Sequence, residues 1–426
     1  MMTDEKTFVV EDQTSEAMEV ATMAGHILLE NGAEISRVEE TMDRIASYYR
    51  VDSRNFFVLS NGIFSTGRRF ASVEFIPFKG TQLDKVVAVN QLSREIERGK
   101  YSLSEAREQL TKIRAMKSKP AWEQILASAL GSAFFCIIFG GSIMDSVVDF
   151  FSGILLYFFV LTLFAPRMSK IFGNICGAAL VTLFCLFSYR LGIGDNLGNM
   201  IIGAVIPLIP GVSFTNGIRD IANEDYIAGM TRMLDALMVF FCIAMGVSLV
   251  FIIDSRITGS MIALSGMSVD TFTAKVPIQI VAAFMGTSAF AVLFGVPRRY
   301  YFISGICGTV GWIVFLLLTR LTNASVVEAS CAATIAVALS ARTCAVLYKC
   351  PITVFLICGI FPLVPGAGIF WTSYYVVANR LSMALGAGFT AIKVTIAIIL
   401  GIILVSEIPF KIWRSLAKRK KQQKAM

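Results

Sequence analysis

Apolar residues are distributed unevenly along the chain. From residue 120 onward, ten apolar segments follow one another, starting near 122, 144, 171, 197, 231, 276, 299, 327, 351 and 388. A helix needs about 20 such residues to cross the roughly 30 Å hydrocarbon core of a bilayer. The pattern therefore predicts a polytopic all-α membrane protein with ten transmembrane helices. The fourth and ninth segments are short and are interrupted by proline and glycine.

Residues 1–119 have the polar pattern of a soluble domain. Apolar positions recur at helical spacing over 15–48, with a turn signal at Asn31-Gly32. Three short strands between about 56 and 76 and two helices over 83–98 and 104–116 follow, and Ser102 and Glu105 have capping-box spacing. This order predicts a small cytoplasmic α+β domain, which we call the head.

The membrane part contains an internal repeat. The segments Pro207–Gly211 and Pro362–Gly366 lie 155 residues apart and share the pattern Pro-Leu-X-Pro-Gly. A copy with five spans places the next copy upside down, which is the plan of many secondary transporters. We therefore predict two inverted five-helix repeats, 120–254 and 276–410, joined by 255–275 and followed by a basic tail, 411–426. The same offset aligns Gly131 with Gly286, Cys176 with Cys331 and Gly246 with Gly401.

Composition and charge support this division. Hydrophobic residues make up 55% of the chain and charged residues 16%, against about 25% charged in soluble domains. Residues 1–119 hold 17 of the 38 basic and 18 of the 30 acidic side chains. With the N-terminus inside, short inner loops carry seven basic residues and outer loops five, which predicts a plasma-membrane protein with both termini cytoplasmic. The net charge of +8 comes largely from the tail, so we expect no nucleic-acid partner.

Several kinds of chemistry are excluded by residue counts. The one histidine, His26, lies in the head, so a Ser-His-Asp triad in the membrane part is excluded, and so is any multi-histidine metal site. The nine cysteines all lie in the apolar part without a CxxC pair, which indicates buried reduced thiols. We therefore predict no catalytic residues, metal or cofactor, and the first 119 residues contain no signal peptide.

Matched proline and glycine breaks are the strongest pointer to a substrate pathway. Proline interrupts the helical hydrogen bonds, and bare backbone is tolerated in a membrane only where it is buried or lines a polar cavity. Kinks kept only for packing are the alternative reading. The predicted pathway residues at the breaks are Pro207, Pro210, Gly211, Pro362, Pro365 and Gly366.

Ionisable residues within the spans are few, and each costs roughly 2.5–3.5 kcal/mol at mid-bilayer. We expect Lys393, about five residues into the tenth span, and Asp235 to act as counter-charges for a substrate or as proton carriers. Arg232 precedes Asp235, and Asn216 and Asp220 follow the first break closely enough to line an inner vestibule. Arg342 in the eighth span and Asp145 and Asp149 at the start of the second complete this group.

The head carries its own charged cluster. Arg37 can pair with Glu34 or Glu40 along one helix, so a salt-bridge face towards solvent or another domain is favoured. His26 and Glu30 lie four residues apart, as a metal or acid–base pair could, but two ligands do not make a site. The predicted head motif is Glu30, Glu34, Arg37 and Glu40.

Three stretches resemble the threonine/serine exporter family. They are the head segment 24–44, the segment 209–220 with Gly229-Met-Thr-Arg232 after it, and Leu363-Val-Pro-Gly366. The likeness covers about 15–410, with the two membrane halves fused in one chain. The resemblance implies export of small amino acids driven by the proton-motive force, and some relatives are linked to succinate export.

The leading hypothesis is a secondary exporter of L-threonine and L-serine that works by alternating access between inverted repeats. Its partners would be a small-molecule substrate, a proton as coupling ion and the lipid bilayer, with the head gating the inner mouth. Alternatives are an exporter of a small dicarboxylate such as succinate, a passive channel, and a membrane-tethered hydrolase with the head as catalytic domain. The substrate, coupling ion, transport direction and oligomeric state stay open.

Overall fold

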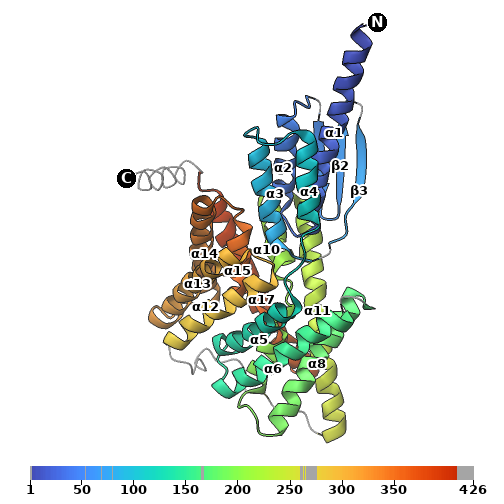
Figure 1. Ribbon diagram of the computed structural model, residues 1–426. Helices are drawn as coiled ribbons and strands as arrows, with labels where there is room; N and C mark the ends of the chain where they lie inside the picture. Colours follow the sequence, from blue (N-terminus) through green and yellow to red (C-terminus); the bar gives the residue numbers. More distant parts are fainter. Residues whose placement is uncertain are drawn as a thin grey trace.

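The computed structural model describes residues 2–409 except 53, 69, 79, 165, 166, 260, 261, 263 and 265–275, with side chains from residue 14 onward (Figure 1). Eight of the described helices are long and apolar enough to cross a membrane, and ten do so if each of two bent helix pairs counts as one span. The chain is therefore a polytopic α-helical membrane protein. Most of the predicted linker 255–275 and the whole tail 411–426 lie outside the described residues.

Four helices and a three-stranded sheet form the head. The sheet is antiparallel in the order β1-β2-β3, and Leu59 pairs with Gly62 across the first turn. The predicted break at Asn31-Gly32 is confirmed, because Gly32 has a φ of +86° that L side chains rarely adopt. The elements are α1 (Met2–Glu30), α2 (Ile35–Tyr48), β1 (Arg54–Leu59), β2 (Gly62–Gly67), β3 (Ala71–Phe75), α3 (Leu83–Ile96) and α4 (Leu103–Arg114).

Local sequence signals explain these helices. The predicted apolar face of α2 is buried at Ile35, Val38, Met42 and Ile45. The capping box at the start of α4 is confirmed: Ser102 accepts from the Glu105 backbone amide, while the Glu105 side chain accepts from the Ser102 amide at 2.8 Å. The apolar face removes side chains from water, and the capping box gives hydrogen-bond partners to backbone amides at the start of the helix.

The two membrane halves have matching elements. The 155-residue offset maps α5 onto α12, and α10 onto α16, residue for residue. The first half contains α5 (Ala121–Ile138), α6 (Ile143–Phe159) with a π-helical turn (Val160–Phe164), α8 (Lys170–Arg190), α9 (Leu197–Val205), α10 (Gly211–Ala222) and α11 (Tyr226–Thr258). The second half contains α12 (Val276–Leu293), α13 (Tyr301–Leu321), α14 (Val326–Tyr348), α15 (Thr353–Ile360), α16 (Gly366–Val377) and α17 (Leu381–Ser406).

Two of the predicted span starts were wrong. The fifth segment was expected near residue 231 and the tenth near 388, whereas α11 begins at Tyr226 and α17 at Leu381. The start of α17 is rich in small residues, including Gly386 and Gly388, which add little hydropathy although they are helical. Lys393 is consequently deeper in its helix than the sequence indicated.

Both predicted breaks are short 3₁₀ turns between two half-helices. They span Ile206–Leu208 and Phe361–Leu363, and the half-helices are bent by 66° in the first pair and 40° in the second. The same bonds recur in both breaks. The amides of Ile209 and Val364 close the turns on the carbonyls of Ile206 and Phe361 at 3.0 and 3.3 Å, and those of Gly211 and Gly366 then donate to the carbonyls of Ile209 and Val364 at 2.8 and 2.7 Å. Equivalent prolines have thus produced equivalent backbone geometry in the two halves.

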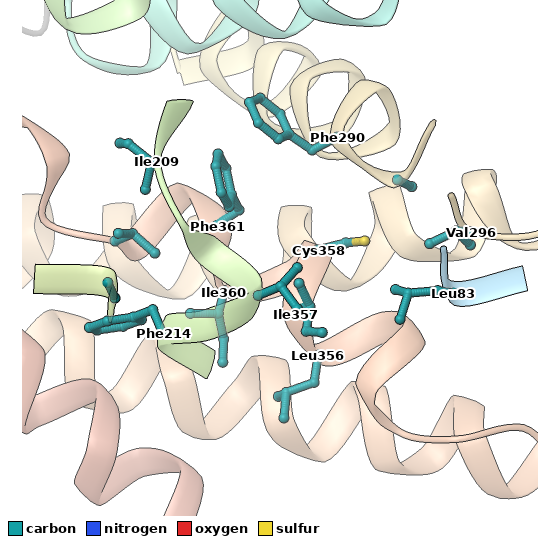
Figure 2. Packing of buried hydrophobic residues seen from close by; sticks show 14 of the residues in the cluster. Leu83, Ile209, Phe214, Phe290, Val296, Leu356, Ile357, Cys358, Ile360 and Phe361 are labelled. Atoms are coloured by element: carbon teal, nitrogen blue, oxygen red, sulfur yellow. The ribbon is translucent and has the colours of Figure 1, made fainter. Parts of the chain in front are cut away.

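The two breaks meet at a contact that we call the crossing point, where Gly211 packs against Phe361 and Gly366 against Ile209. Figure 2 shows Phe361 of the second break between Ile209 of the first break and Phe290 of α12. The rings of Phe290 and Phe361 lie 4.0 Å apart, and Phe135 of α5 lies 5.2 Å from Phe290 and 5.6 Å from Phe361. Gly211 leaves room for Phe361, since a Cβ there would lie 2.6 Å from its ring. Aromatic side chains therefore fill the crossing point.

Helices α5 and α12 pack against each other in opposite directions. One groove is lined by Trp122 and Leu126 near the start of α5 and by Ala289 and Val292 near the end of α12. Their contacts are reciprocal: a Cβ on Gly131 would meet Phe290, and a Cβ on the equivalent Gly286 would meet the equivalent Phe135. Such exchange of contacts is what a two-fold axis produces between two copies.

Replacing Gly246 by leucine is expected to destabilise the protein. A Cβ at this position of α11 would lie 2.4 Å from the Ile175 carbonyl oxygen of α8, and the equivalent Gly401 of α17 is similarly enclosed by α14. Overpacking of this kind costs about 1–3 kcal/mol. Thermal unfolding of the purified chain should show a lowered Tm, whereas Gly386→Leu, with no atom within 4 Å of its Cβ position, should not. Equal effects of the two variants would contradict this packing.

Candidate functional site

The turn between α1 and α2 of the head docks on α10, the half-helix that follows the first break (Figure 1). Asn216 Nδ2 donates to the Gly32 carbonyl at 2.7 Å. The backbone amide of Ile35, the first residue of α2, donates to Asp220 Oδ1 at 3.0 Å. Because a helix leaves its first amides without internal partners, Asp220 caps α2 from another part of the chain.

Arg232 of α11 completes this contact. Its guanidinium donates to Asp220 Oδ2 at 2.6 Å and to the Ala33 carbonyl at 2.9 Å. The Asp220 side chain is fully buried and that of Arg232 is 11% exposed. A buried ion pair that loses one partner is strongly destabilised, so each group depends on the other.

A second ion-pair group lies next to the first. The Glu34 side chain is 2% exposed and contacts Arg219 of α10 and, at 3.5 Å, the Nε of Arg37. Arg37 also donates to Glu40 at 2.7 Å, and Glu30 is buried nearby at the end of α1. Glu34, Arg37 and Glu40 of the predicted head motif thus lie beside Asn216, Asp220 and Arg232 of the predicted pathway, between the head and the membrane part.

The other predicted pathway residues occupy two kinds of position. Pro207, Pro210, Pro362 and Pro365 lie in or directly after the two 3₁₀ turns, and Gly211 and Gly366 begin the half-helices beyond them. Gly366 packs against Ile209, as Gly211 does against Phe361. The structure therefore brings the two breaks together.

Asp235 and Lys393 do not meet. Asp235 of α11 pairs with Lys170 of α8 at 2.5 Å and accepts from Ser213 of α10 at 3.1 Å. Lys393 is exposed on α17, on the same side as Phe389 and Ile396. Arg342 donates to the Val405 and Ser406 carbonyls at the end of α17. The roles predicted for Asp235 and Lys393 stay predictions.

Asp149 is a functional candidate that the sequence reading did not select. Its side chain in α6 is fully buried, and among the described residues no Lys, Arg or His forms an ion pair with it. The Cys185 thiol lies 3.8 Å from Oδ1, while Oδ2 has no hydrogen-bond partner in the part of the chain that the structure describes. Oδ2 lies directly against α9, because a Cβ on Gly203 would be only 2.0 Å away. The carboxyl therefore faces the half-helix that precedes the first break.

The position of Asp149 carries different residue types in the two halves of the internal repeat. Ser132 lies near it, and the equivalents of Ser132 and Asp149 in the second half are Thr287 and Ser304, all three with buried side chains. Both halves therefore have buried polar side chains at these two equivalent positions, and only the first half has a carboxyl at one of them. An ionisable group inside a span is a functional candidate by default, and this signal was present in the sequence.

The histidine of the head has a local partner. His26 Nδ1 lies 2.7 Å from Glu74 Oε2 on β3, in a cavity of about 650 Å³ between α1, β3 and α4. In the described part of the chain no group of three or more His, Cys, Asp or Glu side chains could hold a metal ion. His26 therefore joins α1 to the sheet.

Comparison with known proteins identifies the family of the chain. Residues 19–253 match the family model described as "Putative threonine/serine exporter", and residues 279–408 match the one described as "Threonine/Serine exporter, ThrE". The chain belongs to the threonine/serine exporter family. The first match contains both the head turn and α10, and the second contains the second broken helix.

Two curated members of the threonine/serine exporter family are similar over most of their length. The "Threonine/serine exporter" of Corynebacterium glutamicum is 22% identical over 400 residues, which cover 90% of this chain and 80% of the relative. The "Probable threonine/serine exporter" of Mycobacterium tuberculosis is 19% identical over 414 residues, covering 93% and 78%. No solved structure gave a significant match.

Proposed function

We propose that this chain is a secondary exporter of L-threonine and L-serine that is driven by the proton-motive force. The observation that carries the proposal is the contact between two broken helices in a chain of this exporter family. Discontinuous helices of this kind hold substrate and coupling-ion sites in many transporters. We place the head and both termini on the cytoplasmic side of the plasma membrane.

The mechanism we propose is alternating access between two inverted five-helix repeats. It is supported by the antiparallel packing of α5 and α12 and by the reciprocal contacts of Gly131 and Gly286 with Phe290 and Phe135. A two-fold axis across antiparallel helices lies in the membrane plane, so the two repeats would have opposite orientations. Rocking one repeat against the other would then open the crossing point first to one side and then to the other.

The substrate would bind between the two breaks. The N-termini of α10 and α16, at Gly211 and Gly366, would favour its carboxylate, and carbonyl oxygens of the turns its ammonium group. Phe361 and Phe290 would have to move apart to admit it, so the structure corresponds to a closed crossing point. Lys393 and Asp235 remain proposed pathway residues, although Asp235 is held by Lys170 here.

Asp149 would carry the coupling proton. An ionised carboxylate without a cation costs several kcal/mol inside a protein, so movement of α9 that lets water in or out would change its proton occupancy. The contact between Asp149 and Gly203 links that change to the first broken helix. Proton binding and helix movement would thus be coupled.

An export assay tests this function. In a bacterial host without its own threonine and serine exporters, cells that produce this chain and are loaded with labelled threonine or serine should release the label faster than cells with an empty vector. A protonophore should remove the difference, which distinguishes an exporter from a passive channel. Label from succinate should leave equally slowly in both strains. Absence of any gradient-dependent release of threonine and serine would overturn the proposal.

A further inference from the structure

A basic cavity of about 710 Å³ lies where the head meets the second membrane half. Its wall on the side of the head comes from α2, α3 and the residues just after α3, and its other walls come from α10, α14, α15 and α17. Six cationic side chains and a single carboxylate, that of Glu40, are among the residues lining it. The cations are Arg37, Arg94, Arg98, Arg219, Arg342 and Lys349.

The positive charge of this basic cavity is neutralised only in part within the described part of the chain. Glu34, which does not line the cavity, contacts Arg219 and Arg37. The two oxygens of Glu40 are taken by Arg37 at 2.7 Å and by Arg44, outside the cavity, at 2.5 Å. Over the same residues, Arg94, Arg98 and Lys349 form no ion pair with a carboxylate. Burial, followed by the charges of Arg44 and Arg37, lowers the pKa of Arg94 from its ordinary value. The arginines of the basic cavity therefore repel one another, which costs free energy in the folded protein.

The walls of the basic cavity differ in polarity. The head supplies arginines, whereas α14, α15 and α17 supply apolar side chains such as Val346, Leu356 and Ile402. A zwitterionic amino acid fits poorly, because its ammonium group would be repelled by the surrounding cations. Arginine forks match the oxygens of phosphate, and basic pockets between transmembrane helices bind lipid phosphates.

We propose that the basic cavity binds a phosphate-bearing ligand, which is either the headgroup of an anionic phospholipid or a soluble polyphosphate. The head is tied to the first membrane half by the α1–α2 turn on α10. The head also contacts the end of α12 in the second half, because the amides of Leu83 and Asp84 donate to the carbonyls of Phe294 and Gly295 at 3.1 and 2.8 Å. The ligand would add a link to α14, because Arg94 and Arg98 belong to the head side and Arg342 and Lys349 to α14 and its end. Occupancy would fix the head against both halves. This inference does not depend on which solute is transported.

Thermal unfolding of the purified full chain in detergent tests the proposal. One series uses sodium pyrophosphate, with chloride added to keep the ionic strength constant. The other compares short-chain phosphatidylglycerol with short-chain phosphatidylcholine. A ligand that binds only the folded state raises the Tm. We expect a concentration-dependent rise with phosphatidylglycerol or pyrophosphate and none with phosphatidylcholine. A rise with the lipid alone identifies a headgroup, and a rise with pyrophosphate alone identifies a soluble ligand.

Two variants make the assignment specific. Arg94→Gln combined with Arg98→Gln should weaken binding about tenfold or more, because each arginine would lose charge-assisted hydrogen bonds to phosphate. Lys112→Gln, which removes an exposed cation on α4, should bind as the unmodified chain does. The proposal is overturned if neither ligand raises the Tm of the unmodified chain, or if the double variant responds as strongly as Lys112→Gln.

Discussion

Replacing Asp149 by asparagine is expected to abolish proton-driven export of threonine and serine while leaving the folded protein in the membrane. Asparagine has nearly the same shape, so it fits against Gly203, but it cannot bind and release a proton. Gradient-driven efflux from proteoliposomes should fall to the level of protein-free vesicles. Exchange of labelled for unlabelled threonine, which needs no net proton movement, should persist.

The internal repeat offers a matched control for this variant. Ser304 occupies the equivalent position in the second half and is equally buried. Ser304→Ala should keep proton-driven efflux, because this hydroxyl carries no exchangeable charge near neutral pH. If Asp149→Asn transports like the unmodified chain, the proton is carried elsewhere, and Asp235 becomes the next candidate.

Replacing Asp220 by alanine is expected to release the head from α10. The change leaves Arg232 buried without its carboxylate and the Ile35 amide without a partner. Breaking a buried ion pair by removing one partner costs about 3–5 kcal/mol. Limited proteolysis of the full chain should cut the connection between head and α5 much faster than in the unmodified protein, and the Tm should fall.

A double-mutant comparison distinguishes loss of the Asp220–Arg232 ion pair from an unspecific loss of stability. Arg232→Met combined with Asp220→Ala removes both charges, so the double variant should lose less than the sum of the two single variants. Glu224→Ala, an exposed change beyond the end of α10, serves as the control and should resemble the unmodified chain. Equal proteolysis of Asp220→Ala and Glu224→Ala would show that the head is not held by this network.

Much of the fold could be predicted from local patterns. Hydropathy located the membrane helices, and the Pro-Gly segments located both breaks, because these signals are contained in a few neighbouring residues. The same holds for the capping box at Ser102 and the turn at Gly32. The early start of α17 was missed, because its first residues are small rather than strongly apolar.

The polar contacts of the candidate site could not be predicted in the same way. The bond from Ile35 to Asp220 joins residues 185 positions apart, and no local pattern pairs them. Asp149 lies near the start of its apolar segment, where a carboxylate could equally face the aqueous interface. Its burial follows from the close approach of Gly203, which is a property of packing. Lys393 differs from Asp149 in both respects, because it lies well within its helix and its side chain is exposed.

Coupling between amino-acid and proton movement is tested most directly with a pH-sensitive dye inside proteoliposomes. Vesicles that contain the full chain are loaded with threonine or serine and diluted into buffer of equal pH without the amino acid. The outward gradient should draw protons inward, so the interior should acidify, and the signal should be absent with Asp149→Asn. Loss of the amino acid without any change of internal pH would contradict a proton-coupled exporter, and retention of both amino acids would contradict their export.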